Sequence, residues 1–251
     1  MAHPTLSLLI TNPWFVAIAL NTTLGAIALL LPRIVLTTAG ILHAWGLGIL
    51  VWGCLGVRGY ALIVGYLVLG SAVTRIGKDI KTAKGIAEKR DGARGPENLW
   101  GSAFTAALCA LGYLLSPAPY WWLGYTASLS TKLADTTASE VGKAYGRRTF
   151  LITTLQPVPA GTEGAVSLEG TLAGVGGAMA IALLGYSLQV ISPTDGVICL
   201  LAAQLATTCE SILGATLQQR YPWLTNEVVN GINTAIGAAT AIGLAHLFIN
   251  S

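Results

Sequence analysis

Long apolar stretches dominate the chain and are separated by short polar breaks. A helix needs about 20 mainly apolar residues to cross a bilayer, and eight stretches meet or approach that length. The predicted spans cover residues 14–31, 37–57, 59–76, 98–115, 119–140, 168–190, 195–219 and 227–249. The pair of spans 37–57 and 59–76 is the least certain part of this count, because only Arg58 separates them. The pattern predicts an all-α, polytopic integral membrane protein.

Two polar segments interrupt the pattern within a single transmembrane domain over 1–251. Residues 76–97 place apolar side chains at helical spacing between Lys and Asp, which predicts an amphipathic helix on the membrane surface. Residues 141–170 are rich in Gly, Pro and Thr and predict a loop that dips back into the protein. Residues 1–75 then form the N-terminal helices, and 98–251 hold the helices and the loop that carry the candidate chemistry.

Charge is sparse and one-sided. Charged residues make up 10% of the chain, against roughly 25% in an average soluble domain. All but Arg58 and Lys132 of the 14 Lys and Arg residues follow the first, third, fifth or seventh span. By the positive-inside rule these loops face the cytoplasm, and both termini lie on the opposite side. The basic balance therefore indicates membrane orientation, and no nucleic-acid partner is expected.

Ionisable residues inside apolar spans indicate function, because charges are costly to bury in a bilayer. Such residues, with polar neighbours, occupy the predicted cytoplasmic ends of the fifth, seventh and eighth spans. The set comprises Lys132, Asp135, Ser139, Glu140, Glu210 and Glu227. These stripes predict one shared polar cavity. The alternative is that they only hold helices together, through hydrogen bonds or a Lys132–Asp135 ion pair.

A Gly-rich tract leads into the sixth span. Its candidate phosphate-binding residues are Gly161, Thr162, Glu163, Gly164 and Ser167. Backbone N–H groups in such a turn, and at the start of the following helix, are suited to phosphate oxygens. The basic residues expected beside it are Arg94, Lys143, Arg147 and Arg148. A loop that only packs against the bundle is the alternative, and no Walker A motif is present.

Three sequence segments from this region are recognisable: DTTASEVG from Asp135, PAGTEGAVS from Pro159 and EGT from Glu169. With them, the chain from about residue 75 to its end resembles the phytyl-phosphate kinase family of vitamin E biosynthesis. It is more distantly similar to phytol and dolichol kinases and to CTP-dependent lipid cytidylyltransferases. The resemblance implies a membrane enzyme that phosphorylates phytyl or another isoprenyl monophosphate with a nucleoside triphosphate, CTP being favoured.

The resulting hypothesis is a Mg²⁺-dependent kinase with its active site on the cytoplasmic side. The expected catalytic residues are Lys132, Asp135, Ser139 and Glu140. The expected metal ligands are Asp135, Glu140, Glu210 and Glu227, because carboxylate oxygens suit Mg²⁺. The Gly-rich tract and the basic residues beside it would bind the nucleotide and the acceptor phosphate. A cytidylyltransferase that releases pyrophosphate and a secondary transporter remain alternatives, and monomer and homodimer both stay open.

Overall fold

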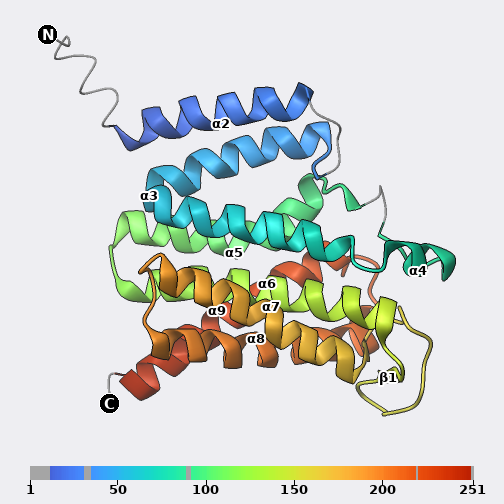
Figure 1. Ribbon diagram of the computed structural model, residues 1–251. Helices are drawn as coiled ribbons and strands as arrows, with labels where there is room; N and C mark the ends of the chain where they lie inside the picture. The colour runs from blue at the N-terminus through green and yellow to red at the C-terminus, as the bar shows by residue number, and fades with distance from the viewer. Residues whose placement is uncertain (1–11, 31–34, 89–91, 219, 250–251) are drawn as a thin grey trace, which may run out of the picture.

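The computed structural model describes residues 12–30, 35–88, 92–218 and 220–249, and the chain there is almost entirely helical (Figure 1). Arg33, Lys89 and Arg90, which contributed to the charge pattern, lie outside the described residues. The helices are α2 (Pro13–Leu30), α3 (Thr38–Thr74), α4 (Lys78–Ala83), α5 (Pro96–Leu115), α6 (Pro119–Tyr145), α7 (Leu168–Ser187), α8 (Pro193–Leu213), the π-helical turn η2 (Gly214–Gln218) and α9 (Asn226–Ile249). The all-α prediction is therefore confirmed.

Helix α3 contains two of the predicted spans. Its backbone turns at Gly56, whose φ of 64° and ψ of −160° are not helical. The second arm folds back along the first, as Figure 1 shows, and the rings of Trp52 and Tyr60 lie 5.2 Å apart. A left-handed φ costs glycine little, which suits Gly56 to this turn. With α3 counted as two arms, the described residues contain eight helical segments of membrane-crossing length.

Helix α6 lies at the centre of the bundle and contacts α3, α5, α7, α8 and α9. Every residue from Leu123 to Ala134 is buried. Six helices of the described chain are long and apolar enough to cross a membrane by length and composition, and α6 is not among them. Its charged residues lower its hydropathy. A 27-residue helix surrounded by its neighbours can carry such residues, because they face protein and not lipid.

Helix α7 approaches α6 closely through glycines on one face. A Cβ built on Gly174 would lie 3.1 Å from the carbonyl oxygen of Ala134. One built on Gly177 would lie 2.6 Å from Thr137 Oγ1 and 2.9 Å from the Leu133 carbonyl oxygen. Small residues at such spacing let helix backbones pack tightly in a membrane. This contact holds α7 against the polar face of α6.

The segment between α3 and α5 differs from the predicted amphipathic helix over 76–97. Among the described residues of this segment, α4 is the one α-helix and has six residues, and its Lys81 is 1% exposed. The chain then returns to the bundle, where Arg94 pairs with the backbone near Leu36. The helix within 76–97 is thus present but short, because the ion pair and backbone contacts of this segment hold the rest of it against the bundle.

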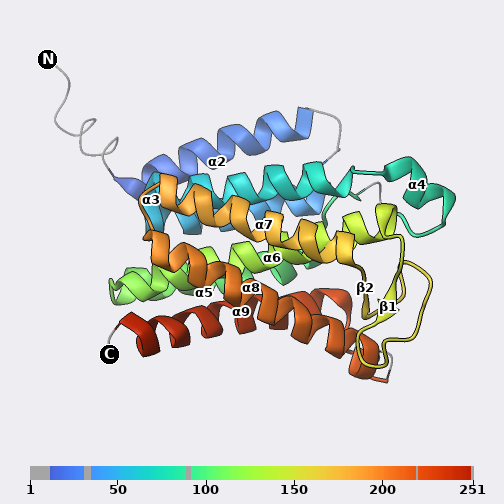
Figure 2. The same cartoon turned by 60° about the horizontal axis from the view of Figure 1, so that its bottom comes forward.

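The Gly- and Pro-rich segment also differs from its prediction as a re-entrant loop. Helix α6 continues to Tyr145, and two short antiparallel strands follow, β1 (Phe150–Leu151) and β2 (Ala165–Val166). Figure 2 shows this ribbon across the end of the bundle, beside the end of α8, and not between the helices. The residue just before β2, Gly164, touches α8: a Cβ built on it would lie 2.6 Å from the Ser211 carbonyl oxygen.

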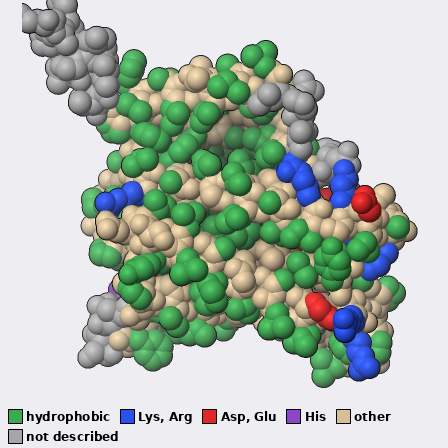
Figure 3. Space-filling view, viewed as in Figure 1, with side chains coloured by type: hydrophobic (Ala, Val, Ile, Leu, Met, Phe, Trp, Pro, Cys, Tyr) green, Lys and Arg blue, Asp and Glu red, His purple; other side chains and the backbone are tan. Residues whose placement is uncertain are grey.

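The two ends of the bundle differ in character. Helix α4 and the β1–β2 ribbon share one end, while α2 begins and α9 ends at the other (Figures 1 and 2). In the space-filling view, Lys, Arg, Asp and Glu side chains gather around the first of these ends (Figure 3). We call it the polar end. Its assignment to the cytoplasm stays a prediction.

Candidate active site

A cavity of about 630 Å³ opens at the polar end and is lined by α3, α5, α6, α7, α8, η2, α9 and both polar loops. Most of the residues selected from the sequence line it. They are Arg94, Lys132, Asp135, Ser139, Glu140, Lys143, Gly161, Thr162, Glu163, Gly164, Ser167, Glu210 and Glu227. The structure places Arg147 and Arg148 elsewhere, exposed in the turn after α6 and outside the lining.

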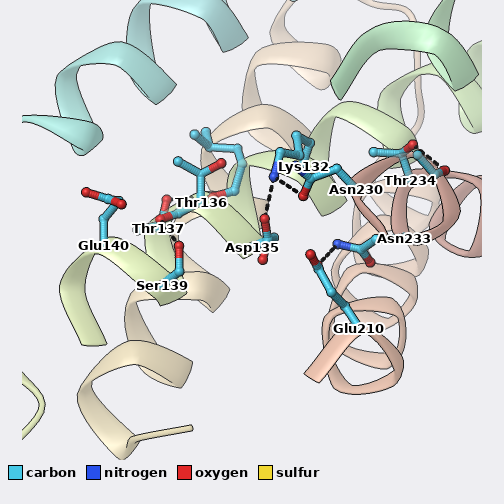
Figure 4. Close-up of polar contacts among 12 residues, drawn as sticks. Lys132, Asp135, Thr136, Thr137, Ser139, Glu140, Glu210, Asn230, Asn233 and Thr234 are labelled. Carbon is cyan, nitrogen blue, oxygen red and sulfur yellow. Dashed lines mark hydrogen bonds and ion pairs between the residues drawn. The ribbon is translucent and has the colours of Figure 1, made fainter. Parts of the chain in front are cut away.

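The inner part of the cavity is built around Lys132, which is 7% exposed. Its ammonium group donates to the carboxylate of Asp135, three residues later on α6, and to Asn230 Oδ1 on α9. Glu210 on α8 accepts a hydrogen bond from the side chain of Asn233 on α9. Three helices thus contribute to one network of charged and amide groups (Figure 4). Each group is held by a partner, which orients it before any ligand binds.

The four predicted metal ligands do not converge on one point. The carboxyl groups of Asp135 and Glu210 face each other (Figure 4). Glu140 points away from them and pairs with Lys81 of α4, with Lys143 Nζ 3.7 Å from it. Glu227 accepts from Asn98 Nδ2 at 3.2 Å. Within the described part of the chain, no group of three or more His, Cys, Asp or Glu residues could hold a metal ion.

The facing carboxylates still suit a Mg²⁺ ion that binds together with a nucleotide. This ion is commonly held by one or two carboxylates, with phosphate and water oxygens completing its shell. Asp135 and Glu210 supply that number of hard oxygen ligands at the wall of an open cavity. A cage made only of protein ligands would need more groups than this arrangement provides.

The Gly-rich tract forms part of the wall with its backbone already folded. Gly161 and Gly164 have φ values of 90° and 77°, a region that favours glycine. The hydroxyls of the tract have internal partners: Thr162 Oγ1 donates to the Pro159 carbonyl at 2.8 Å, and Ser167 Oγ accepts from the Gly170 N–H at 3.1 Å. Ser167 is thereby the N-cap of α7. The hydroxyls of Thr162 and Ser167 are therefore already engaged within the tract and its neighbouring helix turn.

Two further cations, Lys143 and Arg94, line the cavity. Lys143 Nζ lies 3.1 Å from Glu88 Oε1 in the loop after α4. Burial raises the pKa of the Glu88 carboxyl, but the charge and hydrogen bond of Lys143 outweigh burial and bring that pKa below its ordinary value. Arg94 donates to Tyr66 Oη at 3.0 Å and lies 5.3 Å from the centre of that ring. The cavity lining therefore has three basic groups, Lys132, Lys143 and Arg94.

Sequence reasoning missed several residues that hold the site together. Lys81, Tyr66 and Glu88 carry no spacing signal, because each lies on another segment than its partner, which is Glu140, Arg94 and Lys143, respectively. Asn230, by contrast, lies on the polar face that the sequence indicates for the last predicted span, and it accepts from Lys132. Gln204 lines the cavity, and its buried Nε2 has no hydrogen-bond partner.

The fold and the cavity together define a polytopic integral membrane protein with a charged, carboxylate-containing site at one end of its helix bundle. The chain belongs to the family described as integral membrane protein DUF92, whose model matches residues 21–238. No solved structure matches it.

Three relatives extend this assignment. The chain is 61% identical to an uncharacterized membrane protein of Synechocystis over 92% of its own length and 91% of that protein. It is 44% identical to Protein VTE6, chloroplastic, of Arabidopsis thaliana over 82% of its length, and the match spans 64% of the plant protein. An uncharacterized membrane protein of Methanocaldococcus jannaschii is 33% identical over 77% of the chain and 79% of that protein. The resemblance drawn from the sequence segments is confirmed by these relationships.

Proposed function

We propose that the protein is a membrane kinase that transfers the terminal phosphoryl group of a nucleoside triphosphate, CTP being favoured, to phytyl or another isoprenyl monophosphate. The observation that carries the proposal is the pair of facing carboxylates, Asp135 and Glu210, beside the fixed ammonium group of Lys132 in an open cavity. Phosphoryl transfer depends mainly on positioning and on charge stabilisation, and this site offers both.

The basic groups are spaced to hold two phosphorylated substrates. Lys143 follows Lys132 by 11 residues on α6, which is about 16 Å along the helix axis. Lys132 would stabilise charge on the transferred group, while Lys143 and Arg94 would hold the outer phosphates. Mg²⁺ bound by Asp135 and Glu210 would neutralise phosphate oxygens of the nucleotide. The Gly161–Gly164 backbone would contact the nucleotide tail.

The chemical step requires little from the protein beyond this arrangement. An oxygen of the acceptor phosphate attacks the terminal phosphorus, the bond to the bridging oxygen breaks, and the nucleoside diphosphate leaves. The acceptor phosphate is ionised at neutral pH, so the step needs no general base. This suits a cavity whose lining contains no histidine among the described residues.

The choice of acceptor is supported by the family resemblance and by the 44% identity with Protein VTE6. The experiment is a product assay on purified protein with phytyl monophosphate, Mg²⁺ and either CTP or ATP. We expect phytyl diphosphate and nucleoside diphosphate from the wild type. We expect a loss of at least 100-fold in Asp135→Asn, because removing one charge-stabilising group commonly costs that much.

The matched control is Asp79→Asn, an exposed acid of α4 that does not line the cavity, which should retain wild-type activity. Pyrophosphate in place of nucleoside diphosphate would identify a cytidylyltransferase instead. No product with either nucleotide, from protein shown to be folded, would refute the kinase proposal. Equal activity in Asp135→Asn and wild type would refute the assigned site.

A further inference from the structure

Helices α7 and α8 meet deep in the bundle and separate toward its polar end. Their deep contact is a cluster of three alanines with no exposed surface, Ala134 of α6, Ala178 of α7 and Ala203 of α8. One turn from Ala178 toward the polar end, Gly174 of α7 lines the cavity, and so does Gln204, the residue after Ala203 on α8. The alanine cluster is therefore the floor of a gap between the two helices.

This gap reaches the outer surface of the helix bundle. The exposed positions of α8 form a stripe through Leu201, Leu205 and Thr208, and those of α7 include Thr171 and Leu172. Thr171 and Thr208 belong to these exposed stripes and also line the cavity. They are thus the two edges of a side opening, distinct from the exposed Gly-rich loop at the bundle end.

The surroundings of the opening change from apolar to polar over a short distance. Outside it, Leu168, Leu172 and Leu205 are 71%, 62% and 51% exposed. Inside it, Gln204 Nε2 is a buried donor without a protein partner. An apolar rim that leads to an unpaired donor suits a ligand with a hydrocarbon chain and an anionic head group.

We infer that the gap between α7 and α8 is the subsite for the acceptor's isoprenyl chain, through which the head group enters the cavity while the chain stays in lipid. This inference rests on the proposed function. A hydrocarbon chain is strongly disfavoured in water, so an acceptor that entered at the bundle end would expose it. A side opening avoids that exposure and leaves the Gly-rich loop to the water-soluble nucleotide.

The first test narrows the gap and compares acceptors of different chain length. Thr208→Trp places a large ring at one edge, and Leu201→Trp places the same ring on the same exposed stripe, outside the cavity lining. We expect Thr208→Trp to lower kcat/KM for phytyl monophosphate at least ten times more than for a five-carbon prenyl monophosphate. Leu201→Trp should leave both values within twofold of wild type. Equal losses for both acceptors, or no loss, would overturn the inference.

A second test does not depend on turnover. A phytyl monophosphate with a photoreactive diazirine near the end of its chain is irradiated with the protein in nanodiscs, and adducts are mapped by mass spectrometry. We expect adducts within 168–179 and 204–212 that unlabelled phytyl monophosphate removes by competition. Adducts elsewhere, or adducts that a diazirine phospholipid reproduces without competition, would reject the subsite. If the adducts form as expected but no kinase product is found, the proposed function fails and the lipid subsite stands.

Discussion

Lys81→Met tests the buried ion pair that joins α4 to the central helix. Lys81 and Glu140 are 1% and 2% exposed, and they pair directly. Lys81 Nζ also donates to the carbonyl oxygen of Thr74, the last residue of α3, at 2.8 Å. Methionine keeps most of the length and the apolar stem of lysine but removes the charge. The variant therefore leaves the Glu140 carboxylate buried, with Lys143 Nζ at 3.7 Å as its remaining cation.

The magnitude follows from the burial of both partners. Removing one member of a buried ion pair destabilises a protein by about 3–5 kcal/mol, because the other charge is left uncompensated. Lys143 compensates part of this, so we expect about 3 kcal/mol. For a domain of about 200 residues each kcal/mol lowers Tm by roughly 2–4 °C, which gives a decrease of about 6–12 °C.

The assay is thermal unfolding in one detergent at pH 7.5, as a double-mutant cycle with Glu140→Gln. We expect the double variant Lys81→Met/Glu140→Gln to be more stable than Lys81→Met, because no uncompensated charge remains at the pair. Asp79→Asn, on the exposed face of α4, serves as the control and should change Tm by less than about 1 °C. A decrease below about 2 °C in Lys81→Met, or a double variant no better than the single one, would refute this account of the pair.

Three further predictions follow from the same structure. Gly177→Ala should destabilise the protein by about 1–3 kcal/mol in thermal unfolding, because its Cβ meets α6, whereas Gly176→Ala, with open space around it, should be neutral or stabilising. In the product assay, Arg147→Ala/Arg148→Ala should keep kcat/KM within about threefold of wild type, because neither residue lines the cavity. Burial raises the pKa of Glu88, but its partner Lys143 lowers that pKa below the ordinary value of 4.5. The stability that this ion pair contributes is therefore complete above pH 4.5 and is lost as the pH falls through the lowered pKa. The Tm difference between wild type and Glu88→Gln should vanish at the acid end of a series from pH 7 down to 3.

The membrane-spanning helices were predictable because a bilayer imposes a local rule on the sequence. Any segment that crosses it must satisfy its backbone internally and present apolar side chains, and this can be read from about 20 consecutive residues. The two uncertain spans around Arg58 are real helical arms, joined at Gly56. The polar stripes likewise predicted a shared cavity, since ionisable groups in a membrane helix must face one another or water. In the structure, the carboxyl groups of Asp135 and Glu210 face each other in this cavity.

The polar loops escaped prediction because their structure depends on distant partners. Helical periodicity over 76–97 favoured a surface helix, but the buried pair of Lys81 with Glu140 and the attachment of Arg94 to Tyr66 hold the segment against the bundle. The ion pair with Lys81 also holds the Glu140 carboxylate away from Asp135 and Glu210, with which it was expected to bind Mg²⁺. No local pattern encodes contacts between residues 59 positions apart.

The sequence by itself therefore determined that the chain is a helical membrane protein, where its helices run and which residues gather at the polar end. Only the tertiary structure decided which charges pair with which, that Arg147 and Arg148 lie outside the cavity, and that α7 and α8 separate above Ala178 and Ala203. The physical reason is the range of the forces involved. Burial in lipid acts on each segment alone, whereas ion pairs and openings between helices depend on which segments become neighbours.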